Sequence, residues 1–153
     1  MKKNERDRAI RVQADFGFFL LLSLALLFDR SGLAVGCICA ELLHELGYVD
    51  EAYIPAMLER EKIVTTYIGM GLAIPHGTTH DAGIIHKTGI VLLQYPEGID
   101  FGEEKAQLVI GIAGMGGEHM EVLAKVCTAL DDAAVLEKMK TTDDKEWIMS
   151  QLI

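Results

Sequence analysis

Two apolar runs in the second half of the chain limit its fold more than any other feature. They are TGIVLLQ, Thr88–Gln94, and AQLVIGIA, Ala106–Ala113. Short runs of this kind, with many β-branched residues, are typical of central strands that are covered on both faces. Apolar patterns with helical spacing flank them, so strands alternate with helices. The sequence therefore predicts an α/β fold, in the form of a three-layer α/β/α sandwich around a mixed β-sheet.

The rest of the chain supplies shorter elements to this sandwich. Apolar spacing of three and four residues predicts helices at Val35–Leu46, Glu51–Glu61, Met120–Leu130 and Ala133–Met139, and a last helix through Leu152. Strands are predicted at Ala9–Ala14, Ile63–Ile68 and Gly71–Ile74, and a helical turn at Thr79–Ile85. We expect Asp50 to cap the second helix, and the segment Tyr95–Gly102, YPEGIDFG, to form a turn.

The N-terminal stretch has a different composition. Basic residues precede the apolar run Phe16–Phe28, FGFFLLLSLALLF, as they do in a signal sequence. The run is too short for an ordinary membrane-spanning helix, and Asp29 and Arg30 follow it in place of a small-residue cleavage site. We therefore expect a buried helix here, with a membrane-associating segment as the alternative.

The charge balance and the cysteines exclude some classes of protein. The chain has 153 residues, enough for one domain, and its 14 Lys and Arg against 23 Asp and Glu give a formal net charge of −9. A nucleic-acid binder would show a basic surface instead, whereas a partner with a positive surface is compatible with this charge. Three cysteines do not form an even set of disulfides, so reduced thiols are expected.

A histidine between proline and glycine, His76 in GMGLAIPHGT, is the first candidate for chemistry. Pro75 cannot donate to a strand ladder, so the strand before it ends there, and Gly77 lets the backbone bend away. The imidazole is expected at the mouth of a strand, mostly neutral and nucleophilic at the pH of a cell. By itself, the stretch is more often a turn that happens to contain a histidine.

A second histidine, His119, follows the glycine-rich loop Gly114–Gly117 at the start of a predicted helix. Free backbone N–H groups at such a start favour a phosphate or another anion. Both histidines follow predicted strands, at the edge where open α/β sheets bind ligands. This pairing allows phosphoryl transfer without a metal, in which one neutral imidazole attacks phosphorus and a second donates a hydrogen bond.

Three other kinds of site have less support. His76, His80 and His86 suggest a metal cluster, but their spacings of four and six do not match a zinc signature, and we expect no bound metal or cofactor. The loop after Ala113 has neither G-x-G-x-x-G nor a Walker pattern, which disfavours a nucleotide site. The chain also lacks G-x-S-x-G, so a hydrolase triad is disfavoured.

Four separated blocks, in order, resemble the type-2 enzyme IIA domains of the bacterial sugar phosphotransferase system (PTS). They are GYVDEAYIPAMLEREK (Gly47–Lys62), TYIGMGLAIPHGT (Thr66–Thr78), KTGIVLLQYPEGIDFGEE (Lys87–Glu104) and LVIGIAGMGGEHMEVL (Leu108–Leu123). QYPEG followed by FGEE is most similar to the mannitol-specific branch, and the fructose and nitrogen-regulatory branches come next. The resemblance implies one α/β sandwich domain over residues 41–153, preceded by a divergent segment over residues 1–40, a strand plus an apolar helix packed on the domain.

The resemblance implies a phosphotransferase that carries a phosphoryl group. In that family the PHG histidine accepts phosphate from phosphohistidine of HPr and passes it to a cysteine of enzyme IIB, which phosphorylates the sugar during import by enzyme IIC. By motif, His76 is the phosphorylated residue, His119 matches a second histidine of the site, and Arg60 matches an arginine near it. The implied protein is cytoplasmic, needs separate IIB and IIC partners, and neither binds nucleic acid nor inserts stably into a membrane.

The sequence departs from the family pattern in two places. Met70 stands where mannitol-branch domains often have an acidic residue, so the orientation or the pKa of His76 is expected to change. The apolar N-terminal stretch is longer than the strand and amphipathic helix that the family implies, and a divergent insertion or a local reading-frame error would each explain it. The alternative function is a regulatory module of the same fold, in which phosphorylation of His76 controls partner binding.

Overall fold

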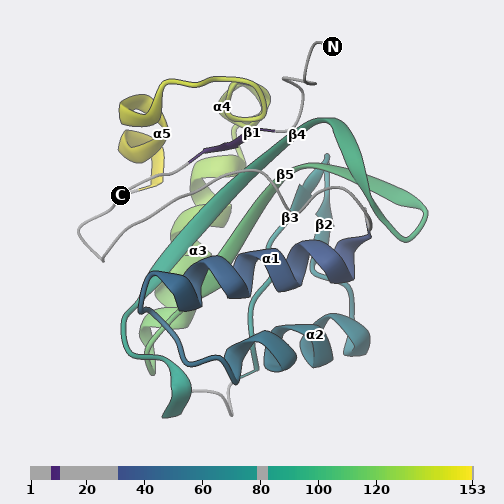
Figure 1. The fold of residues 1–153 in the computed structure, drawn as a ribbon. Helices are drawn as coiled ribbons and strands as arrows, with labels where there is room; N and C mark the ends of the chain where they lie inside the picture. Colours follow the sequence, from purple (N-terminus) through teal and green to yellow (C-terminus); the bar gives the residue numbers. More distant parts are fainter. Residues whose placement is uncertain (1–7, 11–30, 79–82, 153) are drawn as a thin grey trace, which may run out of the picture.

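The computed structural model describes residues 8–10, 31–78 and 83–152, which form a sheet with helices on both faces (Figure 1). The apolar run Phe16–Phe28 lies outside the described residues. Within the part of the chain that is described, no helix is long and apolar enough to cross a membrane.

Five strands of the described chain form one sheet, in the order β1-β4-β5-β3-β2. Their bounds are Arg8–Ile10 (β1), Tyr67–Gly69 (β2), Leu72–Ala73 (β3), Gly89–Phe101 (β4) and Glu104–Ala113 (β5). β3 pairs with β5 in parallel, and the other neighbours are antiparallel. The sheet is therefore mixed, as predicted, and its two long strands contain the two apolar runs.

Alternate residues of the long strands point to two separate cores. On one face, Val91 and Val109 pack with Cys39 of the helix α1 (Gly32–Glu45), beside which lies α2 (Tyr53–Ile63). On the other face, Leu92 and Ile110 pack with residues of α3 (Glu118–Leu130), α4 (Ala133–Met139) and α5 (Lys145–Leu152). Figure 1 shows α1 and α2 over one face and α3 behind the strands. The predicted three-layer sandwich is confirmed.

Glycine at position 111 allows the first helix to lie close to the sheet. A Cβ on Gly111 would lie 2.6 Å from Cys39 Cβ and 2.8 Å from Val91 Cγ2, closer than packed carbon atoms approach. The Cys39 thiol is therefore fully buried between α1 and β5. This burial raises the pKa of the thiol far above the ordinary value. This sulfur is a packing group, because a reactive cysteine needs an accessible thiolate.

The hairpin between β4 and β5 is longer than predicted, since Tyr95–Gly102 is not a turn. β4 continues through Phe101, and the chain reverses at Gly102, which has a φ of 70°. The pairing shifts register between Gln94 and Ile99, so the proline and glycine between them fall where the ladder is irregular. Such a bulge tolerates proline, which cannot donate to the ladder. The proline and glycine of this segment therefore mark a β-bulge, and the prediction that the chain reverses there was wrong.

Asp50 does not cap α2, which is a second correction. The helix begins at Tyr53, and its N-cap residue Ala52 makes no side-chain hydrogen bond. The Asp50 carboxylate instead accepts a hydrogen bond from Nε2 of His86 at 2.8 Å. The side chain predicted to cap the helix thus bonds to a residue that is distant in the sequence. The Asp50 backbone carbonyl accepts from the Tyr53 N–H, which still directs the chain into the helix.

The ends of other elements also differ from the prediction. The strand expected at Ile63–Ile68 is β2 at Tyr67–Gly69, because α2 continues to Ile63. The first strand is described only at Arg8–Ile10, and residues 11–14 and 79–82, which belong to predicted elements, lie outside the described chain. α1 runs through the predicted boundary between residues 40 and 41, and that division into segments stays a prediction.

Candidate functional site

His76 lies just past β3, beside the C-terminal end of β5. It forms an isolated parallel bridge with Ile112, whose N–H donates to the Pro75 carbonyl at 2.9 Å. The ring Nδ1 lies 2.7 Å from the carbonyl oxygen of Ile74. A carbonyl oxygen only accepts, so Nδ1 has the hydrogen and Nε2 keeps its lone pair. Nε2 is therefore the ring nitrogen of His76 whose lone pair is free.

His119 is the second residue of α3 and follows a tight loop that begins at Gly114. A Cβ on Gly114 would lie 2.4 Å from the Cα of His119, so only glycine lets the two backbone segments lie this close. The buried Thr88 holds the loop from the start of β4. Its hydroxyl accepts from the Met115 N–H at 3.0 Å and donates to the Glu118 carboxylate. These contacts fix the start of α3 and, with it, the position of His119.

The structure brings His76 and His119 together. Their ring centroids lie 5.1 Å apart, with 45° between the ring planes. The reason lies in the sheet, because β3 and β5 are parallel neighbours and the segments that follow them emerge at the same edge. The sequence predicted this shared edge. The chemical role of each ring stays a prediction.

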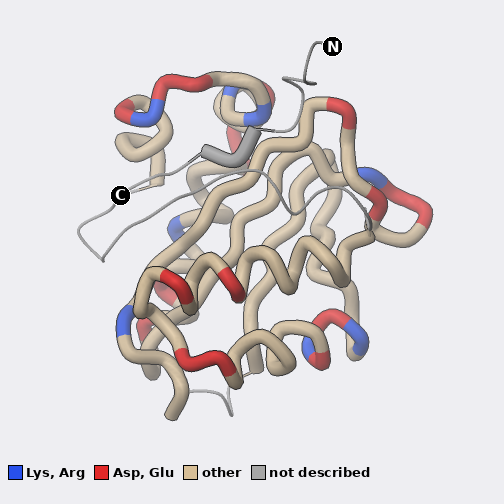
Figure 2. The backbone as a smooth tube through the Cα atoms, in the orientation of Figure 1, with Lys and Arg blue, Asp and Glu red and all other residues tan. Residues whose placement is uncertain are grey.

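Arg60 lies in the last turn of α2, where acidic and basic residues alternate (Figure 2). Its Nη1 donates to the Val64 carbonyl at 2.7 Å and so satisfies a carbonyl group at the end of the helix. Its positive charge also lowers the pKa of His76 and of His119, as expected of a guanidinium close to both rings. The helix-end contact that the sequence indicated for Arg60 is therefore present, and its role in the chemistry stays a prediction.

Burial is the main cause that lowers the pKa of His76 and of His119 below the ordinary value for histidine. At His76, the hydrogen bond to Ile74 and the Glu61 carboxylate act in the opposite direction, and the charges of Arg60 and His119 lower the pKa further. Both imidazoles are therefore neutral at pH 7. This is the state in which an imidazole can act as a nucleophile.

Lowering the pH from about 7.5 to about 5.5 is expected to destabilise the folded chain through these two histidines. Each pKa is lower in the folded than in the unfolded chain, so the unfolded chain binds more protons between the two values. The stabilisation is therefore complete above about pH 6.5 and is lost as the pH falls toward the folded pKa. Urea unfolding at a series of pH values measures the loss. A His76→Gln and His119→Gln double variant is the control, and an equally steep loss in that variant would contradict the assignment.

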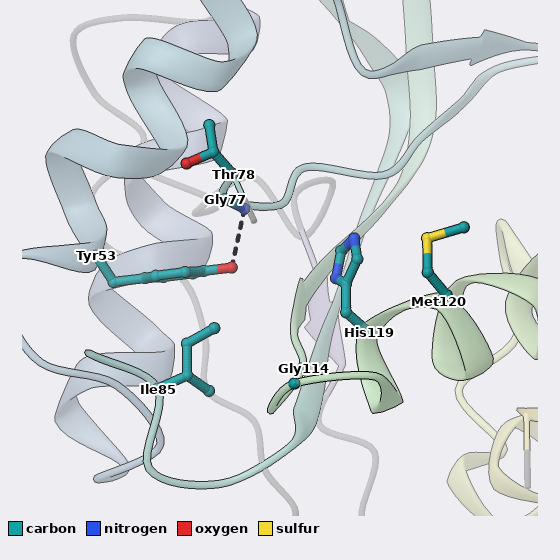
Figure 3. Close-up of a pocket in the computed structure, with 8 residues that line it drawn as sticks. Tyr53, Gly77, Thr78, Ile85, Gly114, His119 and Met120 are labelled. Atoms are coloured by element: carbon teal, nitrogen blue, oxygen red, sulfur yellow. Dashed lines mark hydrogen bonds between the residues drawn. The ribbon is translucent and has the colours of Figure 1, made fainter. Parts of the chain in front are cut away.

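A cavity of about 280 Å³ lies beside His119 and extends to α2 (Figure 3). Tyr53 of α2 and His119 of α3 line it from opposite sides, with Gly77 between them. The Tyr53 hydroxyl donates to the Ile112 carbonyl at 2.8 Å and accepts from the Gly77 N–H at 2.9 Å. Sequence reasoning missed Tyr53, because a buried aromatic residue in a helix is usually only a core residue. No sequence signal distinguishes such a residue from one whose hydroxyl also bonds near a functional site.

The metal alternative depends on His76, His80 and His86. Nδ1 of His76 bonds to a carbonyl oxygen, and Nε2 of His86 donates to Asp50, while His80 lies outside the described residues. Across residues 8–10, 31–78 and 83–152, no group of three or more His, Cys, Asp and Glu side chains is arranged to hold a metal ion.

Met70 lies in the tight turn between β2 and β3 and has a φ of 50°, which is uncommon for any residue but glycine. Glycines with positive φ precede and follow it, and its side chain is 63% exposed. The side chains that shift the pKa of His76 are Arg60, His119 and Glu61, none of which lies in this turn. The expected effect of Met70 on His76 stays a prediction.

Fold and site together define a small α/β sandwich that has two neighbouring neutral imidazoles at one sheet edge and, on α2, an arginine whose charge acts on both. This is the arrangement expected of a phosphoryl carrier. The family model "Phosphoenolpyruvate-dependent sugar phosphotransferase system, EIIA 2" matches residues 37–153, and the chain belongs to this family. Enzymes IIA of this family are phosphotransferases that form a phosphohistidine intermediate.

Known proteins with mannitol-specific names match most of the chain. The mannitol-specific enzyme IIA component of Geobacillus stearothermophilus is 38% identical over 116 residues, which cover 75% of this chain and 80% of the relative. The mannitol-specific EIICBA component of Klebsiella pneumoniae is 44% identical over 115 residues, or 73% of this chain, but the match spans only 18% of that relative. A solved Escherichia coli complex of mannitol enzyme IIA with phosphorylated mannitol enzyme IIB matches with a TM-score of 0.75 and 37% identity, over 86% of this chain and 96% of that one.

Proposed function

We propose that this chain is the enzyme IIA component of a mannitol-type PTS and carries a phosphoryl group from HPr to enzyme IIB on Nε2 of His76. The hydrogen bond from Nδ1 to the Ile74 carbonyl carries the proposal, because it leaves the lone pair of Nε2 free on a ring that lies beside that of His119. The names of the relatives support mannitol as the sugar, and the solved complex supports enzyme IIB as the next acceptor.

In the first transfer, the lone pair of Nε2 attacks the phosphorus of phosphohistidine in HPr. The new P–N bond forms as the bond to the donor imidazole breaks, and the donor keeps that electron pair. The His76 ring then has a positive charge, which its Nδ1–H shares with the Ile74 carbonyl. An N–H of His119 and the charge of Arg60 stabilise the phosphoryl oxygens in the transition state.

In the second transfer, the thiolate of the enzyme IIB cysteine attacks the same phosphorus. The P–N bond breaks, the electron pair returns to Nε2, and His76 is ready for another cycle. Enzyme IIB then phosphorylates the sugar during import by enzyme IIC. This relay places the chain in the cytoplasm, where HPr and enzyme IIB exchange phosphoryl groups.

Incubation with radiolabelled phosphoenolpyruvate, enzyme I and HPr tests the proposal. The chain is expected to gain acid-labile, alkali-stable phosphate, and to lose it to mannitol when mannitol enzymes IIB and IIC are added. Transfer only to fructose components would favour the fructose branch, and a label that no permease accepts would favour the regulatory module. A folded chain that stays unlabelled would contradict the proposal in all of these forms.

A further inference from the structure

The hydroxyl of Tyr53 bridges two backbone groups that belong to different segments of the fold. It donates to the Ile112 carbonyl in β5 at 2.8 Å and accepts from the Gly77 N–H at 2.9 Å. The side chain is 1% exposed, so water does not compete for these bonds. One buried oxygen thus connects α2, the end of β5 and the turn after β3.

Both backbone groups are next to His76 in the structure. Gly77 follows it directly in the chain, and Ile112 is its partner in the parallel bridge. Gly77 is buried, so its N–H would be left without a partner if the hydroxyl were removed, and a buried unpaired donor is costly. The backbone would then move to find another partner, and the turn that contains His76 would move with it.

The same hydroxyl also fixes the helix that contains Arg60. Tyr53 and Arg60 lie about two helical turns apart on α2, and therefore on the same side of the helix. In Figure 3 the Tyr53 ring extends from α2 toward Gly77, across the cavity from His119. The helix that contains Arg60 is thus attached, near its start, to the turn that contains His76.

We propose that Tyr53 is a positioning residue for phosphoryl transfer, because its hydroxyl holds the His76 backbone where Nδ1 donates to Ile74 and the ring lies beside that of His119. The inference rests on the proposed function. It assigns Tyr53 no contact with the phosphoryl group, so the effect of Tyr53 passes through the orientation of the His76 ring.

Tyr53→Phe tests the role, because it removes the hydroxyl and keeps the packed ring. At saturating phospho-HPr, phosphorylation of His76 is expected to slow about tenfold, since small misplacements of a reacting group cost rate. Nitrogen-15 NMR of the imidazole is expected to show a larger population with hydrogen on Nε2. Tyr67→Phe is the matched control: the Tyr67 hydroxyl also accepts from a backbone N–H, that of Gly71 at 3.1 Å, but in the β2–β3 turn. It is expected to change neither quantity.

Equal rates and equal tautomer populations in the two variants would overturn the inference. A chain that takes no phosphate at all would contradict the proposed function alone, because the tautomer measurement needs no donor and still decides the role of Tyr53. Amide hydrogen exchange in the unsubstituted chain decides it even where Tyr53→Phe does not fold. Strong protection of the Gly77 N–H supports the bridge, and exchange at the rate of an unfolded chain overturns it.

Discussion

Replacing His76 by alanine is expected to abolish phosphorylation of the chain, the largest effect of any single substitution that we predict. In the proposed mechanism the attacking lone pair is on Nε2, and the side chain of alanine has no nucleophilic atom. The expected measurement is the loss of radiolabel that phosphoenolpyruvate delivers through enzyme I and HPr. The fold is expected to persist, because the imidazole is only half-buried and lies outside both hydrophobic cores.

His86→Ala is the matched control for this experiment. His86 is also a histidine next to a strand, shortly before the start of β4, but it is exposed and donates to the exposed Asp50 carboxylate on the surface. This variant is expected to take up label at the normal rate. A label that survives in His76→Ala would show that another residue accepts phosphate, and a label lost in His86→Ala would move the acceptor away from His76.

The central layer of the fold was predictable because β4 and β5 are buried on both faces. Such strands consist almost entirely of apolar residues, and this composition is visible without any tertiary information. The length of their hairpin was not predictable in the same way. Pro96 and Gly98 have the composition of a turn, and only the pairing beyond them reveals that the ladder resumes after a shift of register.

The site was predictable only where a local signal existed. His76 and His119 each follow a strand and a glycine-rich or proline-containing break, so the shared edge of parallel strands gathers them. Tyr53 has no such signal, since its hydroxyl bonds to Ile112, 59 residues away along the chain. Asp50 gave a misleading signal for a similar reason, because its actual partner, His86, is 36 residues away.

Replacing His119 by alanine is expected to slow transfer from the phosphorylated chain to enzyme IIB about a hundredfold, as the loss of one hydrogen-bond donor to a transition-state oxygen does elsewhere. Burial and Arg60 lower the pKa of His119, so near pH 7 the neutral ring donates a single hydrogen bond and brings no charge of its own. A chase of the labelled chain with enzyme IIB measures the rate. Urea unfolding is expected to change little, because the ring is half-buried at the rim of a cavity.

Met120→Ala is the control that distinguishes the loss of the His119 imidazole from the loss of any side chain on this surface of α3. Met120 is the next residue of α3, lines the same cavity and is 64% exposed, so its truncation also removes an exposed side chain from the same surface. If the cavity surface alone governed the contact with enzyme IIB, both variants would slow transfer equally. If the imidazole stabilises the phosphoryl group, only His119→Ala slows it, and near-normal transfer by folded His119→Ala would remove this residue from the mechanism.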